Sequence, residues 1–298
     1  MNRGRRINRY RGFSFVELLV VVGILTILAA ILLPYFTAAR ESERRMICMK
    51  NLEAIMAAMT YYASNSHGLY PAVAYDAAHD PNGYTAYTGA DSPNPFAKNT
   101  TVQPNDVTAA IWLLVREHLV QGGPAVFICP SSGDTPDPCR TDGRVVDPDQ
   151  RSNFTDGSHL SYSYSSPYSS APGYQMDDTC PADFALMADK NPGVDPARHC
   201  DVTGPPYNAD PFALSVANSL NHGRAGQNVL YADGHVSFQP TPYCGYGNAD
   251  QRDNIYTALS PIPLTPGDRP PGYSNGYCSR NVGPSWKYDS YLVPTAED

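Results

Sequence analysis

The chain has 298 residues, of which only 17% are charged, and it contains 28 prolines, 23 glycines and 21 tyrosines. This composition favours a loop-rich, β-containing domain and argues against a helical bundle. The formal net charge of −8 gives no overall field that would attract the phosphates of DNA or RNA, so we expect no nucleic-acid partner.

The first element is an apolar segment from Phe13 to Leu33, in which Glu17 is the single charged residue. At about 1.5 Å per residue it forms roughly 31 Å of helix, the thickness of the hydrocarbon core of a bilayer. The residues before it include five arginines and no acid: Arg3, Arg5, Arg6, Arg9 and Arg11. Positive charge on this side predicts that everything after Pro34 lies outside the cytoplasm. A carboxylate in hydrocarbon needs a partner, so Glu17 is a predicted functional residue.

An ordinary secretory signal has its cleavage site after the apolar core, whereas here the small residue, Gly12, precedes it. The segment from Gly12 to Glu17, with Pro34 further on, resembles the N-terminus of type IV pilins and type II secretion pseudopilins. That resemblance implies a prepilin peptidase that cuts after Gly12 and methylates Phe13. It also implies assembly through Glu17 and Pro34: Glu17 pairs with the freed amine of a neighbouring subunit, at an inner-membrane assembly platform. The alternative is a plain membrane anchor whose Glu17 lies near the interface.

The helix is predicted to continue to about Ser66, so we expect a leader over 1–12, a helix over 13–66 and an exterior domain over 67–298. Its second half has apolar residues at three- and four-residue intervals: Cys48, Met49, Leu52, Ile55, Met56, Met59, Tyr62 and Ala63. Such a stripe needs a sheet or another helix to cover it.

The exterior domain alternates long polar loops with short apolar segments. Residues 72–104 and 131–158 are predicted loops. Between and after them we expect a helix over Val107–Val120 and strands over Ala125–Ile128, Leu160–Tyr164, Phe184–Ala188 and Asn254–Thr257.

The strongest local signal is a hairpin from Asn228 to Phe238 with a two-residue Asp233-Gly234 turn. This turn would pair Tyr231 with Val236, and it predicts an apolar face that packs on the helix: Val229, Tyr231, Val236 and Phe238. The predicted fold class is α+β. A long N-terminal helix, hydrophobic in its first half and amphipathic in its second, packs on a small antiparallel sheet with long disulfide-stapled loops.

Several motifs after the apolar segment resemble a large bacterial family of prepilin-like proteins with an H-x9-DG signature. They are Ala39–Glu41, Asn51–Leu52, Leu69–Pro71, Phe127–Ser131, Ala188–Pro192, and His222 followed by Asp233-Gly234. Ten residues separate His222 from Asp233, one more than the signature has. The resemblance implies a pilin-like fold and adds no mechanism.

Six of the seven cysteines lie in the exterior part: Cys129, Cys139, Cys180, Cys200, Cys244 and Cys278. An even number in an oxidising compartment predicts up to three disulfides among 15 connectivities. Close spacing favours Cys129–Cys139 and Cys180–Cys200. No C-x-x-C pair occurs, so the ligand spacing typical of zinc sites is missing.

Asp189, His222 and Asp233, with His235, could converge if the strands form one sheet. One interpretation is a calcium site, because carboxylates in loops bind hard cations and the major pseudopilins that the chain resembles carry such a site. The other is structural: Asp233 makes the turn, Asp189 ends a strand and His222 bonds a loop. We favour the structural interpretation and expect no cofactor.

The sequence lacks P-loop, H-E-x-x-H and G-x-G-x-x-G motifs, so we expect no enzyme. The predicted function is a structural subunit of a pilus-like or pseudopilus-like filament. It would be a single-pass inner-membrane precursor with its exterior domain in the periplasm, and then part of a cell-surface or periplasmic filament. The alternative is a minor pilin or a membrane-anchored adhesin.

Overall fold

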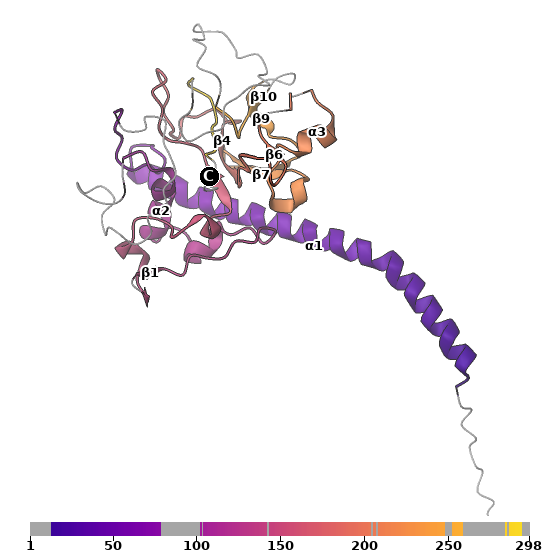
Figure 1. Cartoon of the computed structure of the whole chain (residues 1–298). Helices are drawn as coiled ribbons and strands as arrows, with labels where there is room; N and C mark the ends of the chain where they lie inside the picture. The colour runs from indigo at the N-terminus through magenta and orange to yellow at the C-terminus, as the bar shows by residue number, and fades with distance from the viewer. Residues whose placement is uncertain are drawn as a thin grey trace, which may run out of the picture. The chain divides into compact units, whose positions relative to one another are not determined.

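The computed structural model describes residues 13–78, 102, 104–141, 143–203, 205–206, 208–247, 252–258, 284 and 286–293. The chain divides into two compact units, Met1–Glu43 and Arg44–Asp298. Helix α1 (Phe15–Asn65) runs from the first unit into the second and includes Pro34, as Figure 1 shows. The long helix predicted over 13–66 is therefore present.

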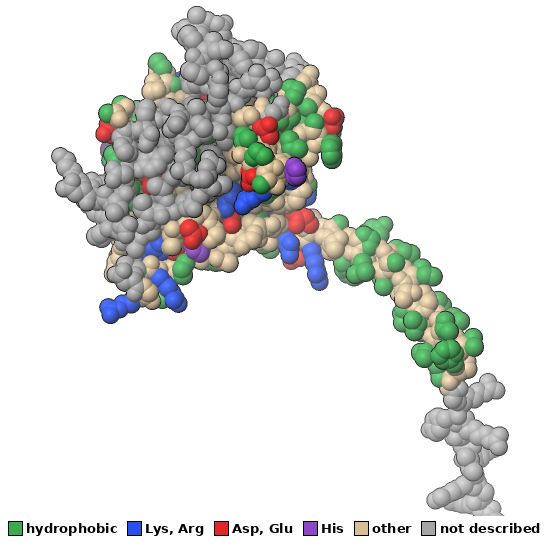
Figure 2. All heavy atoms as spheres, viewed as in Figure 1, with side chains coloured by type: hydrophobic (Ala, Val, Ile, Leu, Met, Phe, Trp, Pro, Cys, Tyr) green, Lys and Arg blue, Asp and Glu red, His purple; other side chains and the backbone are tan. Residues whose placement is uncertain are grey.

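In the first unit, α1 exposes its apolar side chains, which Figure 2 shows along this part of the helix. All the buried residues of α1 belong to the second unit: Cys48, Leu52, Ile55, Ala58, Met59 and Ala63. Within the described residues, α1 is long and apolar enough to cross a membrane, and its most apolar window is not buried at all. The two halves of the helix thus have different surroundings.

The described part of the second unit is built on a four-stranded antiparallel sheet with the order β3-β4-β7-β8. Its strands are β3 (Tyr162–Tyr164), β4 (Ala185–Asp189), β7 (Gln227–Tyr231) and β8 (Val236–Gln239). Three two-stranded pairs accompany it: β1 (Arg140–Thr141) with β2 (Arg144–Val145), β5 (Val194–Asp195) with β6 (Cys200–Asp201), and β9 (Tyr243–Gly247) with β10 (Arg252–Asn254).

The described helices of this unit are short apart from α1. They are α2 (Val107–Arg116), α3 (Pro211–Ser215) and the 3-10 helices η1 (Gly123–Phe127), η2 (Pro148–Gln150), η3 (Gly157–His159) and η4 (Asn221–Arg224). The buried Asp106 caps α2, since its carboxylate accepts from the backbone N–H groups of Thr108 and Ala109. The fold is α+β, as predicted.

Apolar side chains cover both faces of the four-stranded sheet. One core cluster joins the stripe of α1 and most of α2 to Leu186, Met187 and Leu230. The other, on the opposite face, joins Val229 and Tyr231 to residues from the C-terminal part, including Cys244, Ile255, Tyr256 and Leu292. The central strands β4 and β7 are therefore buried along their whole length. Burial on both faces explains their continuous apolar runs.

The hairpin forms, but the predicted register is wrong by one residue. Val236 pairs with Leu230, not with Tyr231. The turn has three residues: the N–H of Gly234 donates to the carbonyl of Tyr231, and Gly234 adopts a left-handed φ of 91°. Because one residue of slip moves a side chain to the other face, Leu230 and Val236 pack on the side of α1, while Val229 and Tyr231 face away.

Other elements differ from their predictions as well. The predicted strand Ala125–Ile128 is wrong: Ala125–Phe127 lie in η1 and Ile128 follows it as the C-cap, and Pro124 has the φ that suits the first turn of a helix. The described strand near 254 is β10, Arg252–Asn254, and its partner β9 is an element that the sequence did not reveal.

The predicted disulfide staples are not confirmed. The described cysteines are all free, and they are Cys48, Cys129, Cys139, Cys180, Cys200 and Cys244. The remaining candidate, Cys278, lies outside the described residues.

Candidate functional site

The start of α1 is a capping box formed by Ser14 and Glu17. The backbone N–H of Ser14 donates to Glu17 Oε2 at 2.8 Å, and the backbone N–H of Glu17 donates to Ser14 Oγ at 3.2 Å. This reciprocal pair satisfies two backbone donors at the helix terminus and places the carboxylate near the positive end of the helix dipole. Phe13, the residue before the cap, is 69% exposed, while Gly12 lies outside the described residues. Glu17 therefore has a local structural role in addition to any role in assembly.

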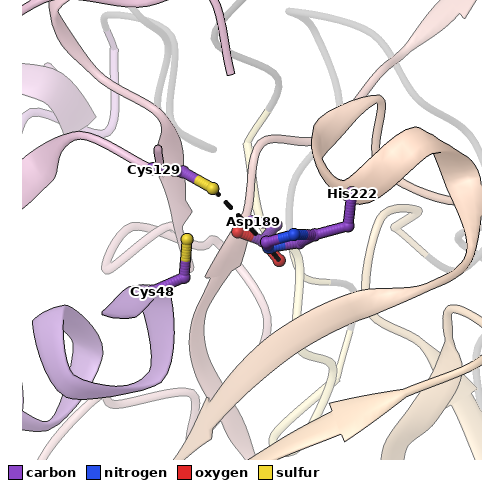
Figure 3. Close-up of side chains that lie close together, drawn as sticks. All are labelled: Cys48, Cys129, Asp189 and His222. Carbon is purple, nitrogen blue, oxygen red and sulfur yellow. Dashed lines mark hydrogen bonds and ion pairs between the residues drawn. The ribbon is translucent and has the colours of Figure 1, made fainter. Parts of the chain in front are cut away.

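A second candidate site lies inside the second unit, where Cys48, Cys129, Asp189 and His222 meet. One ligand atom from each side chain lies within 4.8 Å of the others, and all four residues are buried. Figure 3 shows the sulfur of Cys129 joined by a dashed line to the imidazole of His222, which lies close to the carboxylate of Asp189. Each residue comes from a different segment: α1, the chain after η1, the end of β4, and η4.

The imidazole of His222 is the centre of the cluster. Its Nε2 lies 3.3 Å from Asp189 Oδ2, 3.5 Å from Cys129 Sγ and 3.1 Å from Asn228 Nδ2. His222 has a left-handed backbone, with φ of 57°, which is uncommon for a residue other than glycine. The bend of η4 at this residue accompanies the inward direction of the ring.

Neighbouring amides hold the carboxylate of Asp189. Its Oδ2 accepts from the backbone N–H of Asn228 at 2.6 Å, and its Oδ1 accepts from Asn221 Nδ2 at 3.2 Å. Asn228 Nδ2 also donates to Oδ2, at 3.3 Å. The carboxylate is thus fixed by groups outside the four-residue cluster.

The electrostatics of the cluster reflect its burial. Burial lowers the pKa of His222, but hydrogen bonds to Asp189 and Cys129 and the charge of Asp189 outweigh this effect and raise the pKa to about 10. A hydrogen bond with Cys48, together with burial, raises the pKa of Cys129. The unaided thiol of Cys129 therefore resists ionisation, and a thiolate there needs a cation beside it.

The structure brings together two of the three predicted metal ligands, Asp189 and His222, and places Asp233 elsewhere. Asp233 lies in the exposed hairpin turn, where its Oδ1 accepts from the backbone N–H of His235 at 3.0 Å. Cys48 and Cys129 are the members of the cluster that sequence reasoning missed. Cys48 also fits the apolar stripe of α1, and Cys129 also fits a disulfide with Cys139, so neither had a signal of its own.

The comparisons with known proteins concern the N-terminus. The family model described as the prokaryotic N-terminal methylation motif matches residues 7–33. The chain carries a prepilin-type N-terminal motif. No curated protein and no solved structure matches the chain.

The prepilin-type motif, together with the apolar α1, supports a type IV pilin-like or pseudopilin-like protein and fits a membrane-anchored precursor. It implies processing by a prepilin peptidase and assembly of the pilus type. The match ends at residue 33, before the second unit begins, so it says nothing of the buried cluster. The resemblance to the H-x9-DG family remains a prediction.

Proposed function

We propose that this protein is a structural subunit of a filament of the type IV pilus or type II secretion pseudopilus kind, polymerised through the first half of α1 after its leader is removed. The observation that carries the proposal is the exposed apolar surface of α1 in the first unit. Phe15, Ile27 and Leu33 are each more than 60% exposed, and this part of the helix has no buried residue. A contiguous apolar surface of this kind needs lipid or other protein to cover it.

The prepilin-type motif indicates how the helices of neighbouring subunits could replace lipid around the apolar part of α1. Before processing, the arginine-rich leader keeps the N-terminus at the cytoplasmic face and lipid surrounds the helix. Cleavage after Gly12 removes five arginines and leaves a cationic amine on Phe13. Glu17 of one subunit can then pair with that amine on a neighbour, which satisfies a carboxylate that is costly to keep in hydrocarbon. The apolar helices of neighbouring subunits take the place of lipid.

In this proposal the second unit is displayed outside the cytoplasm and has no catalytic role. The side chains that could carry chemistry in its cluster are fully buried, since Asp189 and Cys48 are 0% exposed and His222 is 3% exposed. Such a cluster has no face open to a substrate, which supports a structural or display role. Whether the subunit forms the bulk of the fibre or a minor part of it is measured by its abundance in sheared surface material.

The capping box allows the charge of Glu17 to be tested apart from its local role. Glu17→Gln keeps the capping hydrogen bond and removes the charge, whereas Ser14→Ala removes the cap and keeps the charge. We expect Glu17→Gln to be cleaved normally but to form no filaments. We expect Ser14→Ala, at a cost of about 1 kcal/mol of helix stability, to form them. Mass spectrometry of the mature N-terminus and electron microscopy of sheared cells provide the two measurements.

Each outcome has a definite meaning. Normal filaments from Glu17→Gln would refute the assembly role of the charge. A wild-type protein that keeps residues 1–12 and stays monomeric in the bilayer would refute the filament function itself. If Ser14→Ala alone abolished filaments, the importance of this segment would lie in helix capping and not in pairing between subunits.

A further inference from the structure

We propose that Cys48, Cys129, Asp189 and His222 form a closed structural site for a divalent transition metal, and that zinc is the ion its donors fit best. The set offers two sulfurs, one imidazole nitrogen and one carboxylate oxygen, which are the ligands that zinc takes in proteins. Calcium would need six to eight oxygens, and this cluster does not provide them. The ligand set therefore differs from the calcium site considered from the sequence, and it does not depend on the filament function.

The spacing of the donor atoms agrees with a tetrahedral zinc site. With zinc bonds of about 2.3 Å to sulfur and 2.0–2.1 Å to nitrogen or oxygen, the ligand atoms should be about 3.6 Å apart for sulfur and nitrogen and about 3.3 Å apart for nitrogen and oxygen. The structure has 3.5 Å between Cys129 Sγ and His222 Nε2, and 3.3 Å between His222 Nε2 and Asp189 Oδ2. All four atoms lie within 4.8 Å of one another, so closing the site around an ion needs a shift of about 1 Å at most.

Hydrogen bonding alone does not account for the convergence on His222 Nε2. This nitrogen carries either one hydrogen or one lone pair, yet three partners lie within 3.5 Å of it. The amide nitrogen of Asn228 also faces Asp189 Oδ2, at 3.3 Å, so it acts as a donor toward both atoms. Asn228 Nδ2 can bond to Nε2 only through the lone pair of Nε2, whereas Asp189 Oδ2, at 3.3 Å, can bond to it only through a hydrogen, so no single state of the imidazole serves both. A metal cation takes the lone pair of Nε2 and is attracted by Asp189 Oδ2 and both sulfurs, while Asn228 Nδ2 keeps its bond to Oδ2.

The surrounding groups have the arrangement that second-shell partners of a metal take. Asn221 Nδ2 donates to Asp189 Oδ1, the oxygen that is not in contact with Nε2, and the backbone N–H of Asn228 donates to Oδ2. Such bonds fix the direction of a ligating carboxylate, and losing them typically weakens metal binding 10- to 100-fold. All four positions of the tetrahedron are taken by protein groups, which is typical of structural and not catalytic zinc.

The four ligands also explain what the metal would do for the fold. They come from positions 48, 129, 189 and 222, so one ion would join the second half of α1 to β4, η4 and the chain after η1. The described cysteines form no disulfide, and the second unit has long loops, so a metal provides the cross-link that the sequence led us to expect from disulfides. Widely separated ligands produce no C-x-x-C spacing, which is why the sequence did not reveal the site.

The test uses the full-length chain, solubilised in detergent and purified without chelators from cells grown with zinc. We expect elemental analysis to give one zinc per chain, and X-ray absorption at the zinc edge to give two sulfur and two nitrogen or oxygen neighbours. In Cys129→Ser and His222→Gln the zinc content should fall to roughly a tenth or less. The matched control is Cys244→Ser, because Cys244 is an equally buried cysteine in the opposite core cluster, and it should keep its zinc.

Three results would overturn the proposal. The first is a wild-type chain that binds no zinc when zinc is supplied under reducing conditions. The second is an X-ray absorption spectrum of the wild type in which the bound zinc has no sulfur neighbours. This measurement does not need the variants to fold. The third is a Cys48–Cys129 disulfide, found by peptide mass spectrometry in protein from the cell envelope, since a disulfide removes both thiolates. Addition of a chelator should also lower the Tm of the wild type and leave that of Cys129→Ser unchanged.

Discussion

Replacing Asp137 by Asn should cost about 3–5 kcal/mol of unfolding free energy, because it breaks a buried ion pair and leaves the guanidinium of Arg151 without a counter-charge. Both side chains are 0% exposed. Arg151 donates from both terminal nitrogens to the carboxylate, which also accepts from the backbone N–H groups of Cys139 and Thr155 at 2.8 Å each. An amide has a single oxygen acceptor, so it can replace only some of these bonds.

The pH dependence of this effect has a definite sign. Burial raises the pKa of Asp137, but hydrogen bonds from Arg151, Thr155 and Cys139 outweigh it and hold the pKa below its usual value. A lowered folded pKa means that the stabilisation is complete above the unfolded value of about 3.9 and is lost as the pH falls through the folded value. The difference between wild type and Asp137→Asn should therefore be constant near neutral pH and shrink below about pH 4.

Urea unfolding followed by tryptophan fluorescence suits this measurement, because the guanidinium of Arg151 lies 5.1 Å from the ring of Trp112. Asp147→Asn is the matched control. Asp147 is an exposed carboxylate of the same polar loop, beside His118, and its replacement should change stability by no more than about 0.5 kcal/mol. A loss at Asp137→Asn below about 1 kcal/mol, or one equal to the control, would refute the reasoning.

Two further substitutions test the packing of the second unit in the same urea assay. Leu52→Ala should cost about 2–5 kcal/mol of unfolding free energy because Leu52 is fully buried on α1. Met46→Ala, on the exposed side of the helix, should cost about 0.5 kcal/mol or less. Equal losses would contradict the assignment of the buried face of α1. Gly226→Ala should cost about 3 kcal/mol or more, since its φ is +146° and a Cβ would lie 2.2 Å from the backbone oxygen of Gln239. Gly143→Ala, at a φ of +77° with no atom near its Cβ, should cost only about 1–2 kcal/mol, and a similar value at Gly226 would show that β7 and β8 can separate there.

The elements that could be predicted are those whose signal is local. The three- and four-residue spacing of Leu52, Ile55 and Met59 identified the buried face of α1, because a helix repeats every 3.6 residues whatever covers it. Asp106, whose carboxylate caps α2, is a local signal of the same kind. The register of the hairpin was not local. Asp233-Gly234 fits both a two-residue and a three-residue turn. The three-residue turn, which forms, places Leu230 rather than Tyr231 on the side of the sheet that faces the helix.

The buried cluster was even harder to predict from local sequence signals than the register of the hairpin. Asp189 stood out because it ends an apolar segment, and His222 stood out because it begins the H-x9-DG-like signature. Cys48 and Cys129 did not stand out, because a buried cysteine is explained equally well by packing or by a disulfide. What joins the four is the tertiary arrangement of α1, β4 and η4, and no spacing along the chain encodes it.

Burial distinguishes two parts of α1: one packs in the core of its own chain, and the other does not. Every buried residue of the helix lies between Cys48 and Ala63, and these side chains belong to the same core cluster as Leu186 and Leu230 of the sheet. The apolar residues from Phe15 to Leu33 have no cover within the first unit. In the proposed filament, exchange of lipid for neighbouring helices would change the surroundings of the first part. The second part can stay fixed in the core of the second unit during that exchange, and a metal bound at Cys48 would hold it there.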